Sequence, residues 1–207
     1  MREVDCESYR AQMLRQACAR QEYIRIERSI VGAEDITGFV VALGSRWVLV
    51  SVISRGAPNG WVAVPLSDVA SLQPAAGGRF VRRGLESQSY RPAAAPDCYL
   101  ALSDDSSALL VSAAAYFPLV TFFVERQDPH SCVIGRPVGW TDSQVDWQEM
   151  NVDAMWEHTP TTFDLSDVTR MDVGGQYETA LGRVADLRGG AVRFSSPGSA
   201  ASREAVD

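Results

Sequence analysis

The chain has 207 residues, of which 46% are hydrophobic and 22% charged, which is ordinary for a globular protein with a proper core. Its formal net charge of −7 argues against a protein that follows nucleic-acid phosphates with a broad basic face. All 19 basic residues are arginine, which excludes chemistry that needs a lysine: a Schiff base, a lysine general base or a phosphate-loop lysine.

The sequence predicts a cytoplasmic protein with reduced thiols and no membrane association. No segment reaches the roughly 18 apolar residues that a membrane span needs, and the polar first ten residues do not form a secretory signal. The cysteines are scattered without a C-x-x-C pair, which favours small buried hydrophobes over disulfides. They are Cys6, Cys18, Cys98 and Cys132.

The first half of the chain is expected to form a helix followed by five short strands. Apolar residues at helical spacing, from Tyr9 to Cys18, predict a short helix. Alternation and turn signals then predict strands at 23–28, 37–43, 47–53, 61–64 and 69–72. Residues 37–53 are apolar on both faces, so both faces of this hairpin should be covered.

A connecting region rich in Ala, Gly, Pro and Arg follows at 73–98. We expect a strand near 79–83 to extend the first unit to residue 88, and residues 89–103 to form a linker. The one basic cluster of the chain lies in this region, interleaved with Phe80 and Tyr90. It consists of Arg79, Arg82, Arg83 and Arg91.

The second half repeats the order of the first. A helix stripe from Leu109 to Phe117 ends at Pro118, and strands are expected at 119–125, 133–140, 144–150, 161–164 and 168–172. After Gly174-Gly175, a helix is expected with Leu181 on its apolar stripe. Residues 187–207 are polar, small and rich in glycine, which predicts a disordered tail.

Short motifs recur between the halves at a nearly constant distance of about 98 residues. Leu66-Ser67-Asp68-Val69 recurs as Leu165-Ser166-Asp167-Val168, and Glu27-Arg28 recurs as Glu125-Arg126. Gly38 likewise corresponds to Gly135. This register predicts a duplicated small domain, with one unit at 8–88 and the other at 104–186.

A helix followed by five short strands, with a bent central hairpin and a tight corner before the last strand, resembles the Sm-like small barrel. Gly38 and Gly135 stand where that family bends its second strand. The resemblance implies a mainly β, α+β fold: two tandem Sm-like small barrels, each with an N-terminal helix. The second half is also similar to uncharacterised bacterial proteins.

The RNA site of Sm-like proteins does not carry over to this chain. The loops that hold an Asp and an Asn in that family contain Gly44-Ser45-Arg46 and Thr141-Asp142-Ser143 here. The corners that hold an Arg-Gly end in Asp68 and Asp167, and an acidic corner repels phosphate. Nucleic-acid binding in the manner of that family is therefore not expected.

The start of the chain also resembles a WYL domain, an Sm-like regulatory module. The similarity lies in the run from Leu14 to Ile26 and in Arg46-Trp47-Val48-Leu49, which has Trp-Val-Leu instead of Trp-Tyr-Leu. The alternative interpretation is that Trp47 fills the barrel.

No set of residues forms an expected active site, metal site or cofactor site. His130 and His158 are expected in loops beside proline, outside any serine-hydrolase or zinc motif. Asp142, Asp146 and Asp153 lack the dense spacing of a calcium loop. The basic cluster at 79–91 suits an acidic partner or a phosphate, and the alternative interpretation is a solvated strand face.

The leading hypothesis is a non-enzymatic interaction module, without cofactor, that binds a protein partner or itself through its sheet edges. The alternative is a regulatory sensor that binds a small ligand or nucleic acid. The residues that bind are not identified by the sequence.

Overall fold

The computed structural model describes residues 3–91 and 93–185, with side chains described from residue 9 onward. The expected disordered tail lies outside these residues. The elements of the first half are α1 (Glu3–Arg20), β1 (Tyr23–Arg28), β2 (Ile36–Leu43), β3 (Trp47–Ser54), β4 (Ala57–Pro65), the 3₁₀ turn η1 (Leu66–Asp68), β5 (Val69–Pro74) and α2 (Gly78–Ser87). Those of the second half are α3 (Ser106–Ala114), β6 (Val120–Phe123), β7 (Cys132–Trp140), β8 (Gln144–Glu149), β9 (Thr161–Asp164), η2 (Leu165–Asp167), β10 (Arg170–Val173) and α4 (Gln176–Val184).

The expected mainly β composition is confirmed, but the expected strand near 79–83 is wrong. That segment is the helix α2, which begins after Gly77, a residue with a left-handed φ of 75°. Val81 and Leu85 lie one helical turn apart, and Leu85 is fully buried. The structure therefore buries this segment with helical rather than strand periodicity.

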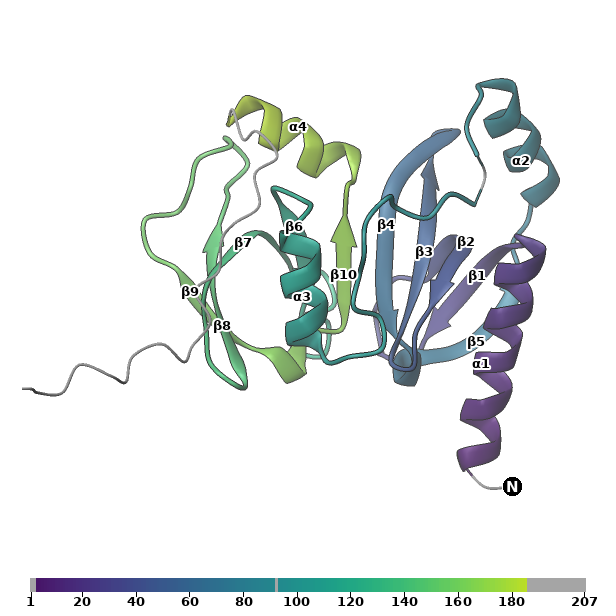
Figure 1. Cartoon of the computed structure of the whole chain (residues 1–207), viewed down its shortest axis with the longest axis horizontal. Coiled ribbons are helices and arrows are strands. Elements are labelled where there is room, and N and C mark those ends of the chain that lie inside the picture. The colour runs from purple at the N-terminus through teal and green to yellow at the C-terminus, as the bar shows by residue number, and fades with distance from the viewer. Residues whose placement is uncertain (1–2, 92, 186–207) are drawn as a thin grey trace, which may run out of the picture.

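All ten strands belong to one sheet, in the order β5-β1-β2-β3-β4-β10-β6-β7-β8-β9. Every neighbouring pair is antiparallel. In Figure 1 α1 runs along the outer side of the first half, and α3 lies across the second half in front of β6 and β10. The two runs of five strands follow the same order, and they meet where β4 lies beside β10.

The prediction of two separate Sm-like barrels is wrong. The sheet is continuous and does not close into a barrel, because Trp61–Ala63 of β4 pair with Val173–Met171 of β10. The hydrophobic core is shared as well. Trp47, Leu49 and Ala63 of the first half are buried in the same cluster as α3 and the strands of the second half.

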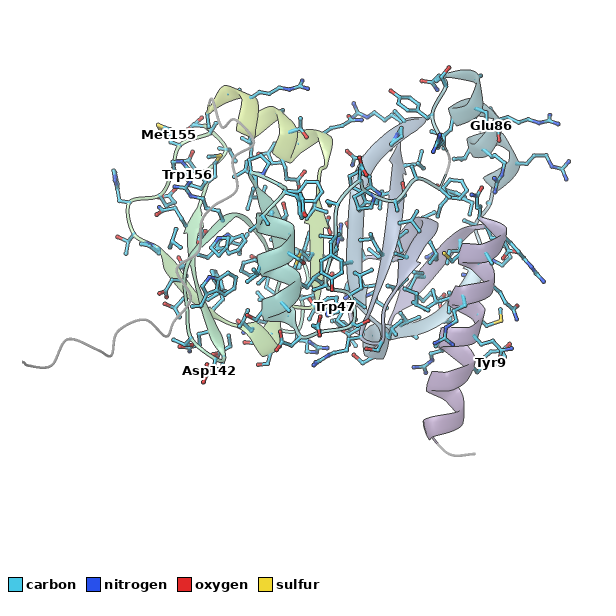
Figure 2. The ribbon with its side chains drawn as sticks, viewed as in Figure 1. Tyr9, Trp47, Glu86, Asp142, Met155 and Trp156 are labelled. Atoms are coloured by element: carbon cyan, nitrogen blue, oxygen red, sulfur yellow. The ribbon has the colours of Figure 1, made fainter. Side chains whose placement is uncertain are left out.

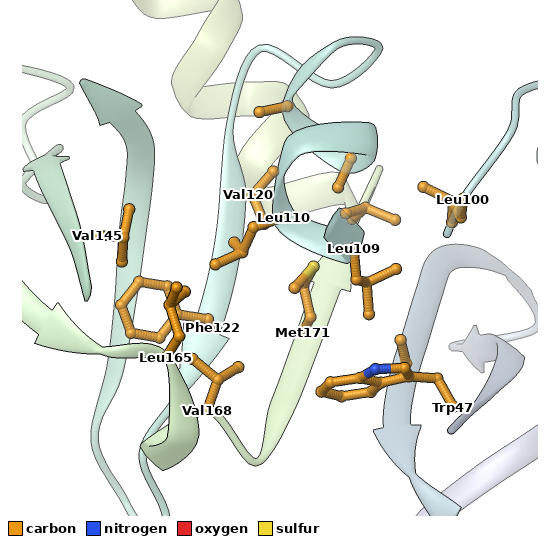
Figure 3. Close-up of a cluster of buried hydrophobic side chains, with 14 of the residues drawn as sticks. Trp47, Leu100, Leu109, Leu110, Val120, Phe122, Val145, Leu165, Val168 and Met171 are labelled. Carbon is orange, nitrogen blue, oxygen red and sulfur yellow. The ribbon is translucent and has the colours of Figure 1, made fainter. Parts of the chain in front are cut away.

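Figure 3 shows this shared core, in which Trp47 lies close to Met171 and Leu109 under α3. Trp47 is 2% exposed, and its indole Nε1 donates to the carbonyl oxygen of Asp104 at 3.2 Å. A second cluster belongs to the first half alone and is covered by Leu14 and Ala17 of α1. The predicted covering of both faces of the hairpin at 37–53, which forms β2 and β3, is confirmed: Val40 and Val48 lie in the cluster of the first half, whereas Val41, Trp47 and Leu49 face the shared core. The second half therefore supplies one of the two covers.

The expected linker 89–103 ends in a buried segment. Leu100 and Leu102 join the shared core. The carbonyl oxygen of Leu102 accepts hydrogen bonds from the backbone N–H groups of Arg46 and Trp47, at 3.3 and 2.9 Å. The connection between the halves is thus fastened to the turn between β2 and β3.

The repeated glycines lie where two strands approach each other closely. A Cβ on Gly38 would collide with the carbonyl oxygen of Ser51, and one on Gly135 with that of Gln148. Both glycines are on the second strand of their half, opposite the third. Close backbone approach explains why glycine stands at both positions.

A buried ion pair joins the halves beside the β4–β10 seam. The Nη2 atom of Arg28 donates to Oε2 of Glu125 at 2.8 Å, and the two side chains are 0% and 1% exposed. The same Nη2 donates to the carbonyl oxygen of Thr169, whose hydroxyl donates to Glu125 Oε2, each at 2.8 Å. The repeated Glu-Arg motif is therefore used across the seam, with the arginine of the first copy bound to the glutamate of the second.

Replacing Glu125 by alanine should lower the free energy of unfolding by about 3–5 kcal/mol, because Arg28 is left buried without a counter-charge. Urea denaturation at pH 7 measures the change. Glu22→Ala is the control, because Glu22 forms an exposed pair with Arg20 at 3.5 Å and its loss should change stability by less than about 1 kcal/mol. Equal losses in the two variants would contradict the structural role of the buried pair.

Candidate functional site

The structure does not bring together the histidine and aspartate residues that are candidates for chemistry in the sequence. His130 and His158 are exposed, in the β6–β7 and β8–β9 loops respectively. Asp142, at the tip of the β7–β8 hairpin in Figure 2, and Asp153 are exposed too. Among the side chains that the structure describes, at 9–91 and 93–185, no group of three His, Cys, Asp or Glu is placed to hold a metal ion.

The basic cluster is divided by the helical conformation of α2. Arg82 faces the body of the protein: its guanidinium lies 5.5 Å from the ring centroid of Phe39 and donates to the carbonyl oxygen of Gln21. Arg79 and Arg83 are exposed, as is Phe80, which is 81% exposed. One member of the cluster thus packs α2 against the sheet, and the others face solvent.

A charged cluster lies on β10, at the centre of the sheet. Arg170 binds Asp172 through two hydrogen bonds of 2.8 and 2.6 Å, stacks on the ring of Phe123 at 4.2 Å, and approaches Glu34 of the first half at 3.7 Å. Burial raises the pKa of Asp172 to about 6, with smaller raising contributions from Glu178 and Glu125, although the bonds from Arg170 act in the opposite direction. The groups are paired with one another, and the cluster ties β10 to both halves of the sheet.

The best-formed candidate site for a partner is the outer edge of β5. This strand is paired with β1 on one side only, so its other side is an unpaired edge of the sheet. Such an edge offers backbone N–H and C=O groups to another extended chain.

A hollow of about 250 Å³ lies between this edge and α1. We call it the α1–β5 hollow. It is lined by Tyr9, Arg10 and Met13 of α1 and by Ala70, Ser71 and Leu72 of β5. Tyr9 is 61% exposed, and in Figure 2 it lies on the outer part of α1. An unpaired strand beside a mostly apolar hollow provides both backbone hydrogen bonds and a place for side chains.

The arrangement follows from local features of α1 and β5. Tyr9 and Met13 are four residues apart, so they lie on one face of α1, while Leu14 is fully buried below them. In β5 the register with β1 shifts between Glu27 and Arg28, which leaves Ala70 as the extra, exposed residue of a bulge. The helix spacing could be seen in the sequence, but the neighbourhood of residues 9–13 and 70–72 could not.

The other outer edge, β9, is less suited to accept a strand. It has four residues, and its two threonine hydroxyls donate to carboxylates of β8: Thr161 to Glu149 at 2.5 Å and Thr162 to Asp146 at 2.7 Å. Pro160 precedes the strand and Asp164 ends it. Short length, proline and charge are features that protect a sheet edge from pairing.

Comparisons of the chain with protein-family models, curated proteins and solved structures find no match. The Sm-like and WYL-like resemblances therefore stay predictions. In the part of the chain described above, no helix has the length and apolar character needed to cross a membrane.

Asp172 should make the stability of the protein depend on pH in a defined direction. Its pKa is about 6 in the fold, above the ordinary value of 3.8, so the folded state binds the proton more tightly than the unfolded state. The stabilising contribution is full below pH 3.8 and is lost as the pH rises through about 6. Over this window the free energy of unfolding should fall by up to about 3 kcal/mol relative to Asp172→Asn, which cannot titrate. Urea denaturation of both proteins from pH 4 to pH 7 checks this, and parallel pH profiles would contradict it.

Proposed function

We propose that this chain is a non-enzymatic interaction module that binds a protein partner by strand addition at the outer edge of β5. The observation that supports the proposal most directly is the coincidence of an unpaired edge strand with the α1–β5 hollow. In this mode of recognition an extended segment adds to the sheet, backbone bonds supply affinity, and pockets for alternate side chains supply specificity.

The lining of the α1–β5 hollow defines the chemistry of the partner. Tyr9, Met13 and Leu72 offer apolar surface, which favours apolar side chains at alternate positions of the added segment. Arg10 is the one charged residue of the lining, so an acidic side chain in the segment would find a counter-charge there. The expected partner segment is therefore extended, with alternating apolar residues and at least one Asp or Glu.

A second copy of the chain is a weaker candidate for this partner. The internal seam pairs apolar Trp61, Val62 and Ala63 of β4 with β10. By strand order, β9 occupies in the second half the place of β4, but its exposed positions are the polar residues Thr161, Thr162 and Asp164, after Pro160. A head-to-tail contact between copies would lack the apolar residues of the internal seam.

The remaining expectations support the same proposal. His130 and His158 lie in separate loops, which favours binding over catalysis, and no cofactor is proposed. Cys18, Cys98 and Cys132 are free thiols, in keeping with the expected reducing cytoplasm. The acidic net charge still favours a protein partner over nucleic acid.

Selection from a library of random linear peptides should enrich sequences with this pattern. A synthetic peptide from the selection should protect from hydrogen exchange those amides of residues 69–73 that point away from β1, because the added strand bonds to them in the full chain. Ala70→Glu places a carboxylate in the hollow, where it competes for Arg10 and repels the acidic side chain of the segment, so it should weaken peptide binding at least about tenfold by fluorescence anisotropy.

Thr162→Glu is the matched control, because it adds the same side chain to an exposed position of the other outer edge. It should leave the affinity for the peptide within about twofold of the unchanged chain. Protection confined to another surface, or equal effects of the two substitutions, would refute strand addition at β5. Light scattering of the protein alone, across a series of concentrations, distinguishes self-association from peptide binding. Self-association would raise the molar mass with concentration in the absence of peptide.

A further inference from the structure

A second hollow, of about 330 Å³, lies where the two halves of the sheet meet at the end that carries η1 and η2. We call it the corner pocket. It shares no residue with the α1–β5 hollow, so an inference about it goes beyond the proposed function. Its polar lining consists of Ser45, Arg46, Ser67, Ser106, Arg126 and Ser166.

Both copies of the repeated Leu-Ser-Asp motif contribute their serine to the corner pocket. Each motif forms a 3₁₀ turn, and the backbone N–H of its leucine is bonded at 2.8 Å to the hairpin loop of its own half: Leu66 to the carbonyl oxygen of Arg46, and Leu165 to that of Ser143. Ser67 and Ser166 are exposed, and no bond of either hydroxyl occurs among the described residues. Two hydroxyl groups from distant parts of the sequence are thus presented to one pocket.

The pocket is positively charged within an acidic protein. Two arginines line it and no acidic residue does, although the chain carries a net charge of −7. Asp68, the acidic residue of the first Leu-Ser-Asp corner, has a side chain that is 5% exposed and that accepts a hydrogen bond from Nη2 of Arg126 at 2.6 Å. Asp68 orients the guanidinium of Arg126 and offsets much of its charge, so the unpaired positive charge of the pocket comes from Arg46.

Arg46 leaves its guanidinium available to a ligand. It is exposed on the turn between β2 and β3, and its side chain makes no hydrogen bond or ion pair with the described residues. Its backbone is held firmly, since its N–H donates to Leu102 and its carbonyl oxygen accepts from Leu66. The base of the side chain is therefore fixed while its charged end lines the pocket.

A neighbouring hollow of about 280 Å³ limits the size of the ligand. It shares Arg46, Ser106 and Ser166 with the corner pocket and adds Asp105, Asp142 and Asp164. These carboxylates repel negative charge beyond the two arginines. A compact anion fits the corner pocket, whereas an extended polyanion would reach the neighbouring hollow and be repelled by its three aspartates.

We infer that the corner pocket binds a compact oxyanion, the phosphoryl or carboxylate group of a small molecule, through Arg46, Arg126 and the hydroxyls of Ser67 and Ser166. Guanidinium groups form charge-assisted hydrogen bonds with such oxygens, and the serine hydroxyls complete the shell of donors. Because the pocket joins residues of both halves, a bound anion would also stabilise the seam between them.

Titration of the ¹⁵N-labelled full chain with inorganic phosphate, and separately with acetate, at constant ionic strength in chloride tests this inference. Saturable amide shifts are expected at residues 45–46, 66–67 and 165–166, and the stronger of the two ligands identifies the phosphoryl or the carboxylate source. Arg46→Gln should weaken binding about tenfold, since one charge-assisted pair is lost. Arg79→Gln, which removes an equally exposed guanidinium from α2, should leave the affinity within about twofold.

A second variant keeps the test independent of Arg46. Ser166→Glu places a carboxylate in the pocket at an exposed position and should abolish the saturable shifts, whereas Ser87→Glu on α2 should not. Thermal unfolding without ligand verifies that each variant is folded. Shifts that stay linear with concentration, or equal affinities of Arg46→Gln and Arg79→Gln, would overturn the inference and leave the strand-addition proposal untouched.

Discussion

The pairing of β4 with β10 is the contact on which the rest of the architecture depends. It converts two runs of five strands into one ten-stranded sheet and places Ala63 and Trp61 opposite Met171 and Val173. Because the seam buries one face of β3 and β4 under the second half, Trp47 becomes core rather than surface. The two outer strands of the sheet are therefore β5 and β9, and only these two strands have a free edge to which another strand could be added.

Charge reinforces this seam from one side. The Arg28–Glu125 pair is completely buried, and Arg28 Nε, Arg28 Nη1 and Glu125 Oε1 have no partner among the described residues. A buried pair of this kind contributes little net stability, but it disfavours any arrangement that separates the two charges. Its value to the fold is that it fixes the register of the two halves, while the shared apolar core supplies the favourable free energy.

The sequence predicted the local structure well and the global arrangement poorly. All ten strands followed from alternation and turn signals, because these depend on neighbours along the chain. The prediction of two closed barrels was wrong. The apolar residues on both faces of 37–53 indicate that other segments cover the hairpin, but they do not indicate which segments these are. The burial of Asp68 and the approach of residues 9–13 to residues 70–72 escaped prediction for the same reason. Both depend on contacts between segments far apart in sequence.

The connection at Leu100–Leu102 has a consequence for biosynthesis. A ribosome completes β4 about a hundred residues before β10, roughly 5–20 s earlier at ordinary rates of translation. During this interval the nascent first half has an unpaired β4 strand and an uncovered Trp47. Leu100 and Leu102 emerge early within it and can cover the indole before the remaining strands exist. Because this short segment is bonded to the β2–β3 turn in the fold, its early docking there would shorten the time during which the growing chain exposes apolar surface to other nascent proteins.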